Sequence, residues 1–95
     1  IPVFELSTLP VAKHKVKPEY PDYLKQKEIE GDVLLAATID ENGKVVNITV
    51  KRSDHELFSK AAMTALKRFS FKPGEQNGRP VTTTIDIPIK FVLNE

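Results

Sequence analysis

Few side chains in this 95-residue chain have the types and spacings that catalysis or metal binding requires. The two histidines, His14 and His55, lack partners at the spacing of a zinc site or of a catalytic triad. We therefore interpret both as surface residues. The sequence contains no cysteine, which excludes disulfide bonds and thiolate metal sites, and no cofactor is expected.

Glu28, Glu30 and Asp32 are the group that most resembles the paired carboxylates of a hydrolase. They flank a predicted turn between a helix and a strand, where acidic side chains are commonly only solvated. The chain is therefore not expected to be an enzyme. A small hydrolase that uses these carboxylates is kept as an alternative, and replacing them with amides would abolish its activity.

Basic residues provide no clear site for an anion. Gly74 and Gly78 bracket a loop near Lys72 and Arg79, but the strand, loop and helix with G-x-x-x-x-G-K that cradle a phosphate are lacking. The 14 Lys and Arg residues nearly balance the 13 Asp and Glu residues, for a net charge of +1. Neither nucleic acid nor direct membrane contact is expected, because both need a dominant positive field.

The backbone of residues 81–93 is a better candidate for binding. Apolar and polar side chains alternate there, which predicts a half-buried β-strand with Thr83 as its one polar core-side residue. Pro88 has no N–H to donate to a neighbouring strand, so the strand is predicted at a sheet edge with Pro88 facing outward. Backbone groups alternate along an unbulged strand, so four more residues are expected to face outward: Thr82, Thr84, Asp86 and Lys90. An edge of this kind can pair with another chain.

A β-hairpin is predicted upstream of this strand. Residues 33–39 and 46–50 alternate in the same way, and they are joined by Asn42-Gly43, the pair favoured in two-residue type I′ turns. Pairing Glu41 with Lys44 places three apolar pairs on one face. The predicted pairs are Ile39 with Val46, Ala37 with Ile48, and Leu35 with Val50.

Two helices complete the predicted domain. Pro21 suits the first turn of a short helix over residues 22–27, and Ser53 and Glu56 form the capping-box pattern of a longer amphipathic helix. The order helix, strand, strand, helix, strand predicts a two-layer α+β fold. Its three-stranded antiparallel sheet has the last strand at an open edge, and residues 75–80 are expected to form a loop.

The first 19 residues are expected to be an extended lead-in or the end of a linker, since they contain three prolines and no sustained period. Residues 20–95 are then the domain, and an apolar content of 40% is sufficient for one core. The chain begins with Ile1-Pro2 and has no apolar run of membrane-spanning length, so we expect a processed or excised soluble piece.

Five short motifs resemble, in order, the signatures of the TonB C-terminal domain family. They extend over residues 20–93, and the family's order of helices and strands agrees with the order predicted above. The motifs are Tyr20-Pro21, residues 29–33 (Ile-Glu-Gly-Asp-Val), residues 40–45 (Asp-Glu-Asn-Gly-Lys-Val), residues 69–74 (Phe-Ser-Phe-Lys-Pro-Gly) and residues 78–81 (Gly-Arg-Pro-Val).

The resemblance implies a periplasmic domain of an energy transducer that is anchored in the inner membrane of a Gram-negative bacterium. Such a domain binds the TonB box of an outer-membrane transporter as an added strand. ExbB and ExbD, which would act through an upstream part absent from this chain, supply a force from the proton gradient. The transported nutrients would be siderophores, cobalamin or glycans.

By position, the resemblance places partner contacts at Thr82, Thr84, Asp86, Pro88 and Lys90, and near the transporter at Lys17, Tyr20 and Pro21. The family often has Gln-Pro where this chain has Lys17-Pro18, so Lys17 is a candidate to meet an acidic residue of the transporter plug. Tyr20 has two open interpretations, a partner contact or a ring that seals the first helix to the sheet.

Two alternatives within interaction proteins remain. In the first, this is a TonB-like or TolA-like domain that is attached to a different parent protein and binds another envelope partner or peptidoglycan. An exposed edge can also pair with a copy of itself, which would give a homodimer.

Overall fold

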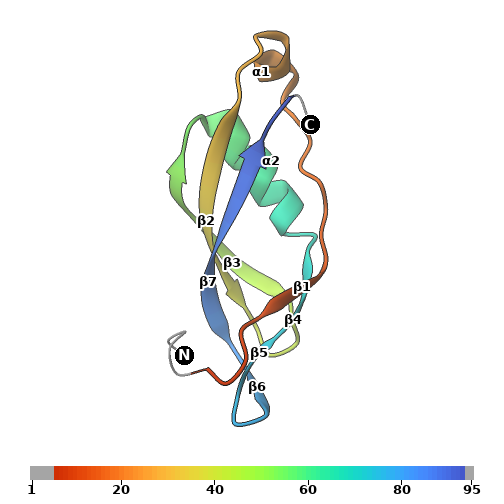
Figure 1. Ribbon diagram of the computed structural model, residues 1–95, viewed down its shortest axis with the longest axis vertical. Helices are drawn as coiled ribbons and strands as arrows, with labels where there is room; N and C mark the ends of the chain where they lie inside the picture. Colours follow the sequence, from red (N-terminus) through yellow and green to blue (C-terminus); the bar gives the residue numbers. More distant parts are fainter. Residues whose placement is uncertain (1–5, 94–95) are drawn as a thin grey trace.

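The computed structural model describes residues 6–93, which form an elongated molecule of 49 × 22 × 21 Å (Figure 1). None of the helices in this part of the chain is long and apolar enough to cross a membrane. The elements in order are β1 (Val11–His14), α1 (Asp22–Gln26), β2 (Gly31–Ile39), β3 (Val45–Ser53), α2 (Glu56–Leu66), β4 (Ser70–Lys72), β5 (Gly74–Gln76), β6 (Arg79–Val81) and β7 (Thr83–Phe91).

The main sheet is antiparallel and has the strand order β3-β2-β7, so β7 lies at an edge. The α2 helix covers one face of this sheet, as Figure 1 shows. The predicted two-layer α+β fold with a three-stranded sheet is therefore confirmed. Pairing between β2 and β7 runs without a bulge from Gly31 opposite Phe91 to Ile39 opposite Thr83.

The core lies between the sheet and α2. Alternate residues of β2 are fully buried against the helix, as the period of two predicted. Thr83 is only 1% exposed, which confirms it as a polar residue on the core side. The largest fully buried apolar side chains are Leu24, Val33, Leu35, Ile39, Phe58 and Leu66.

The β2–β3 hairpin has two of the three predicted pairs. At the tip, however, Ile39 lies opposite Val45 rather than Val46, so the predicted register is wrong there by one residue. The two pairs that match are Ala37 with Ile48 and Leu35 with Val50.

The turn itself explains this difference. The Asp40 carboxylate accepts hydrogen bonds of 2.9 Å from the N–H groups of Asn42 and Lys44. Within the turn only Gly43 has a positive φ, of 84°. The connection is therefore a type I turn followed by a left-handed glycine, not a two-residue type I′ turn. A Cβ at Gly43 would lie 1.9 Å from the carbonyl oxygen of Phe71, so only glycine fits where the hairpin tip contacts β4.

The start of α2 also differs from the prediction. β3 continues to Ser53, and His55 has the extended backbone of an N-cap residue. The His55 Nδ1 atom accepts a hydrogen bond of 3.0 Å from the N–H of Leu57, and the Ser53 hydroxyl donates to the His55 carbonyl at 2.8 Å. His55 thus replaces Ser53 as the cap, because the strand extends through the position at which the capping box was predicted.

Two short ribbons were not predicted. β5 and β6 pair across a turn in which Asn77 and Gly78 both have positive φ, so residues 75–80 form a β-hairpin and the predicted loop is wrong. β1 lies within the predicted lead-in and pairs with β4. The lead-in is therefore packed on the domain from Ser7 onward; its first residues, 1–5, lie outside the described part.

Candidate functional site: the outer edge of β7

The direction of each backbone group of β7 follows from the hydrogen bonds of β2. The Asp32 carbonyl accepts from the N–H of Asp54, and the N–H of Asp40 donates to the Lys44 carbonyl, so even-numbered residues of β2 face β3. Odd-numbered residues of β2 consequently face β7, and the register pairs them with odd-numbered residues of β7. The even-numbered residues of β7 must then direct their N–H and C=O groups outward. Pro88 has no N–H and is one of this outward set.

No second strand pairs with the outer side of β7 within residues 6–93. The side chains of Thr84, Asp86, Pro88 and Lys90 are exposed on the face of the sheet opposite α2. The four residues therefore form a row with both an open backbone edge and accessible side chains. Thr82 precedes β7, at the junction with β6, and is also exposed.

Two side chains of this row are held across the sheet. The Thr84 and Thr38 hydroxyl groups are hydrogen bonded at 2.9 Å. Lys51 Nζ reaches across β2 to Asp86 Oδ2 at 2.8 Å, and both side chains are about half exposed. Exposed pairs of this kind add little stability, so they orient the row more than they stabilise the sheet.

The lead-in passes beside the outer edge of β7 and leaves hollows along it. A mostly apolar hollow of about 580 Å³ separates residues 15–18 from residues 87–90, with Phe69 and Phe71 also in its lining. Further along the strand, Leu9 and Pro10 line another hollow with residues 84–86. The edge is thus a groove with one wall of strand and one wall of lead-in.

Backbone hydrogen bonds fix this second wall. The N–H groups of Ser7 and Thr8 donate to the Glu75 carbonyl at 2.8 and 3.1 Å, and the Glu75 N–H donates to the Thr8 carbonyl at 2.9 Å. The Ser7 hydroxyl accepts from the N–H of Asn77 at 2.8 Å. Together with the pairing of β1 and β4, these contacts hold the lead-in at a defined position relative to β7.

Tyr20 seals the end of the sheet that lies near α1. Its ring makes edge-to-face contacts with Phe58 and Phe91, at centroid distances of 5.6 and 5.7 Å, and its hydroxyl donates to the Ile29 carbonyl. Burial, and to a smaller extent the Glu30 carboxylate, raise the pKa of the Tyr20 hydroxyl above its ordinary value. In the domain without a partner, Tyr20 therefore acts as the ring that seals this end of the sheet.

The other two candidates near Tyr20 are more accessible. Lys17 is exposed and reaches the rim of the apolar hollow, while Pro21 is half-buried as the N-cap of α1. Lys17, which belongs to the lead-in wall, and Tyr20 lie near the end of β7 that carries Lys90, since these three residues line one further hollow. Pro21 follows Tyr20 directly in the chain.

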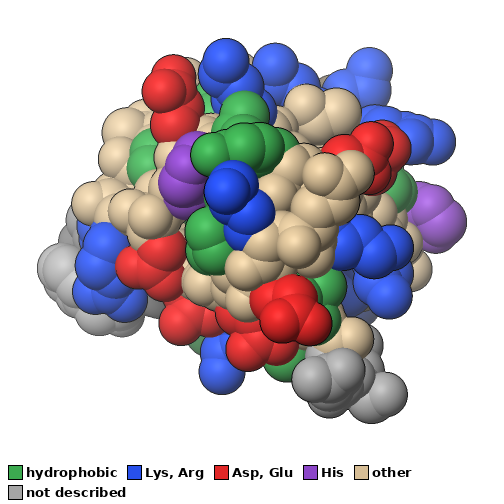
Figure 2. All heavy atoms as spheres, turned by 90° about the horizontal axis from the view of Figure 1, so that it is seen from above, with side chains coloured by type: hydrophobic (Ala, Val, Ile, Leu, Met, Phe, Trp, Pro, Cys, Tyr) green, Lys and Arg blue, Asp and Glu red, His purple; other side chains and the backbone are tan. Residues whose placement is uncertain are grey.

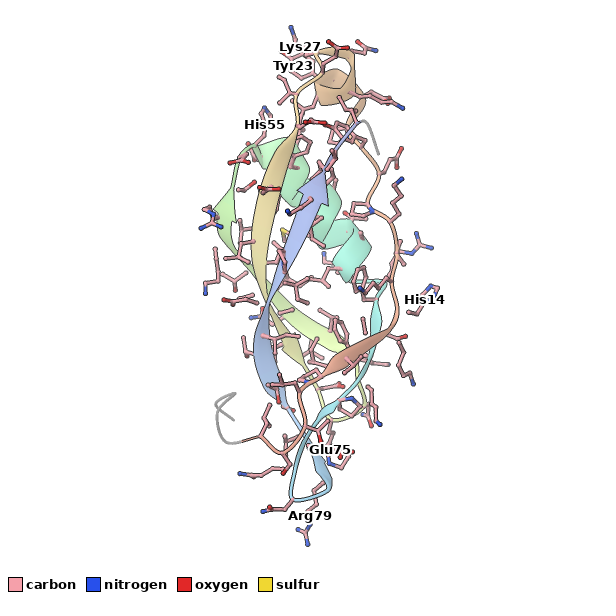
Figure 3. All side chains as sticks on the ribbon, in the orientation of Figure 1. His14, Tyr23, Lys27, His55, Glu75 and Arg79 are labelled. Carbon is pink, nitrogen blue, oxygen red and sulfur yellow. The ribbon has the colours of Figure 1, made fainter. Side chains whose placement is uncertain are left out.

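The two histidines considered for catalysis are not brought together. His14 and His55 lie on opposite sides of the molecule (Figure 3), and His55 serves as a helix cap. A carboxylate oxygen of Glu30 accepts a hydrogen bond of 2.8 Å from the N–H of Leu93, which gives it a structural role. No cluster of potential metal ligands occurs among residues 6–93.

The charged side chains at the α1 end of the molecule are of both signs (Figure 2). On the face seen in Figure 2, acidic and basic side chains are interspersed around the end of the molecule that carries α1. This end therefore presents no field of one sign.

Sequence reasoning missed the residues that make the groove. Val16 and Phe69 line the hollow, but the lead-in has no hydrophobic period, and Phe69 was expected only to pack in the core. The groove arises between segments far apart in the chain, so no local pattern could reveal it.

The family model and several curated relatives point to the same family. The family model described as the C-terminal part of the Gram-negative bacterial TonB protein matches residues 16–93. Protein TonB of Xanthomonas campestris pv. campestris is 30% identical over 84 residues, which are 87% of this chain and 38% of that protein. Protein tonB2 of Pseudomonas aeruginosa is 34% identical over 82 residues, which are 85% of this chain and 30% of that protein. The chain thus spans less than two fifths of these relatives.

Solved structures show the same fold. The TonB C-terminal domain of Pseudomonas aeruginosa superimposes with a TM-score of 0.76 at 23% identity, covering 90% of this chain and 88% of that one. A TonB C-terminal domain of Helicobacter pylori gives a TM-score of 0.65 at 31% identity, covering 83% and 84% of the two chains.

Proposed function

The chain belongs to the TonB C-terminal domain family, and from this premise we propose that it binds the TonB box of outer-membrane transporters by adding the box as a strand to β7. The domain works in the periplasm as the interaction module of a TonB-type energy transducer. Its role is binding and force transmission, not catalysis.

The observation that carries this proposal is the outward row of β7. Thr84, Asp86 and Lys90 present backbone N–H and C=O groups at an edge that no other strand of the described residues covers. An extended peptide can satisfy these groups with its own backbone, so affinity comes from a ladder that most sequences can form. Related transporters with different boxes can therefore share one domain.

Strand addition also suits a domain that pulls. Hydrogen bonds of a ladder loaded along the strand are sheared together, whereas bonds loaded across the strand open one at a time. We propose that force from ExbB and ExbD, transmitted through upstream sequence, acts along this ladder on the transporter plug. Siderophores, cobalamin and glycans are the nutrient classes whose uptake this would drive.

A second contact with the transporter is proposed at the α1 end. Lys17 is exposed there and suits an acidic plug residue, and Pro21 is partly accessible. Tyr20 contributes by holding this end in place, because its ring and hydroxyl are already engaged within the domain. The box and the plug would thus contact adjacent parts of one surface.

The test is a titration of the ¹⁵N-labelled chain with a TonB-box peptide, followed by backbone amide shifts, with a peptide of scrambled sequence as control. We expect saturable shifts centred on Thr83–Phe91 for the box peptide and weaker, less specific shifts for the scrambled one. Shifts confined to the β2–β3 turn or to the exposed side of α2 would contradict strand addition at β7.

A further inference from the structure

The lead-in is the covalent path by which a force from upstream sequence reaches the sheet. We propose that residues 7–19 form a strap that detaches under such tension before the sheet opens, and that the load then passes to Tyr20. The source of the tension rests on the proposed function, whereas the order of detachment is a property of this chain. The strap adds a mechanical step to the transducer.

The strap is joined to the domain by two short pairings. Ser7 and Thr8 form backbone hydrogen bonds with Glu75, and β1 pairs with β4 at three positions, with a break in register between Ala12 and His14. By contrast, β2 and β7 pair at nine consecutive positions without a bulge. Hydrogen bonds that are loaded together share the force, so the shorter pairings give way first.

Side-chain packing adds little to the strap. None of residues 7–19 is buried, and Leu9 and Val11 are 53% and 58% exposed. No side chain of residues 9–19 forms a hydrogen bond or an ion pair with another described residue. Detaching the strap therefore exposes less apolar surface than opening the sheet, as is typical of a segment that opens before the rest of its domain.

Tyr20, directly after the strap, is held more firmly. Its ring contacts Phe58 and Phe91 edge to face at centroid distances of 5.6 and 5.7 Å, and these two rings are themselves buried and stacked at 4.4 Å. The Tyr20 hydroxyl donates to the Ile29 carbonyl. A force that has removed the strap therefore meets the aromatic core of the domain.

Detachment also moves the point at which force enters the domain. Figure 3 shows Glu75, to which the start of the strap is bonded, toward one end of the long axis, and Tyr23 at the other end. Tyr20 lies toward this second end, because its ring contacts Phe91, the last residue of β7. The molecule is 49 Å long, so the load crosses much of its length. A strand added to β7 would then be loaded from the α1 end.

The first experiment pulls single molecules between the upstream end of the chain and a non-thiol handle introduced at Lys44. This residue follows the turn at the end of β2 that lies away from Tyr20. We expect two steps. In the first, at the lower force, the 13 residues 7–19 leave the domain and lengthen the tether by about 45 Å or more. A single step, in which strap and sheet open together, would overturn the proposal.

A disulfide across the strap provides the matching variant. The chain has no cysteine, and Val11 lies opposite Lys72 in the pairing of β1 with β4, so Val11→Cys with Lys72→Cys can form one disulfide. When oxidised, this variant should shorten the first step to about 15 Å, because only residues 7–10 can leave. Reduction should restore the full step.

A second disulfide is the control for the first. Ala36→Cys with Thr49→Cys joins β2 to β3, away from the strap, and should leave the first step unchanged when oxidised. If the disulfide across the strap also leaves the first step at full length, the segment that detaches is not the strap and the proposal is wrong.

Replacing Tyr20 tests where the load passes next. Tyr20→Ala should lengthen the first step by about 15 Å, because the chain would peel as far as Leu24, the next buried residue. Tyr20→Phe keeps the ring contacts and should keep the wild-type length. Tyr23→Ala is the control, because Tyr23 is 57% exposed on α1. Equal first steps in Tyr20→Ala and Tyr23→Ala would contradict the role assigned to Tyr20.

Hydrogen exchange tests the strap without an applied force. The N–H groups of Thr8 and Glu75, which pair the strap with β5, should exchange at least about a hundredfold faster than those of Ile85 and Ile87, which face β2. Equal protection of the two pairs, after correction for their intrinsic rates, would contradict a weakly held strap.

The outcomes separate this inference from the proposed function. A box peptide that shifts the β7 amides of a domain that opens in one step would overturn the strap and leave strand addition standing. Two steps that the disulfide shortens, together with a box peptide that leaves β7 unaffected, would support the strap and overturn the proposed function.

Discussion

Proline at Thr84 is expected to weaken partner binding while leaving the domain folded. The N–H of Thr84 points outward, so its loss removes no hydrogen bond to β2. The substitution also removes the side-chain bond to Thr38, which is exposed and worth about 1 kcal/mol or less. The residue before a proline must be extended, and Thr83 already is. We expect the free energy of unfolding to fall by about 1 kcal/mol.

The effect on binding should be larger. A box peptide would lose one ladder hydrogen bond, and its own carbonyl group would be left without a partner inside the groove. Together these losses amount to about 1–3 kcal/mol, or roughly a five- to hundredfold increase in Kd. Isothermal titration calorimetry with the peptide gives the Kd, and urea unfolding gives the stability.

Two control variants make the comparison sharp. Thr84→Val keeps the N–H and loses only the hydroxyl, so it should lower stability to a similar degree and bind the peptide normally. Ile85→Pro removes an N–H that faces β2, and we expect it to destabilise the domain by about 3 kcal/mol or more. If Thr84→Pro unfolds the domain as Ile85→Pro does, the outward direction assigned to Thr84 is wrong. If it folds and binds with unchanged Kd, no partner strand pairs there.

Three further predictions concern the scaffold. Gly31→Ala would place a Cβ 2.9 Å from the ring of Phe58, so we expect a loss of about 1–3 kcal/mol in urea unfolding, and a loss below 0.5 kcal/mol would contradict the tight contact. The pKa of the Tyr20 hydroxyl is raised in the folded state, so the neutral hydroxyl contributes fully to the free energy of unfolding below about pH 10, and this contribution is lost as the pH rises from there. Tyr20→Phe should therefore make the loss of stability at alkaline pH less steep. An unchanged loss in the variant would refute the raised pKa of Tyr20. Asp86→Asn breaks the ion pair with Lys51, but it should change the free energy of unfolding by less than about 1 kcal/mol, and the stability of the variant should depend little on salt concentration. A larger loss of stability in thermal unfolding would show that the pair contributes more than an exposed contact does.

The part of the fold that follows from local backbone chemistry could be predicted from the sequence. Pro88 restricts its strand to an edge, and alternation along an unbulged strand then gives the outward direction of Thr84, Asp86 and Lys90. The missing N–H of a proline and the alternation of backbone groups involve only residues that are neighbours in the chain. Neither depends on contacts with distant segments.

The tip of the hairpin shows why a local pattern can mislead. Asn42-Gly43 is compatible with two kinds of turn, and the sequence favoured the two-residue type. The Asp40 side chain selects the other type by accepting the N–H groups of Asn42 and Lys44, which shifts Ile39 by one partner. At Asn77-Gly78 the same dipeptide does form a turn with two positive φ values, although a loop was expected there.

The lead-in could not be predicted, because its structure depends on distant segments. β1 exposes most of its side chains and so has no hydrophobic period, and it is a strand only because β4 offers it a partner. The groove wall, the hollow and its rim of Lys15 and Lys17 all depend on this pairing. The sequence therefore predicted the open edge of the sheet, but the structure was needed to find the groove.

Hydrogen exchange of the β7 amides, measured free and saturated with a TonB-box peptide, tests the central claim most directly. The amides of Ile85, Ile87 and Ile89 face β2 and should be protected in both states. The outward amides of Thr84, Asp86 and Lys90 should exchange quickly in the free domain and slow at least tenfold on binding, as the new ladder closes over them. Outward amides that exchange at the same rate with and without peptide would contradict strand addition at this edge.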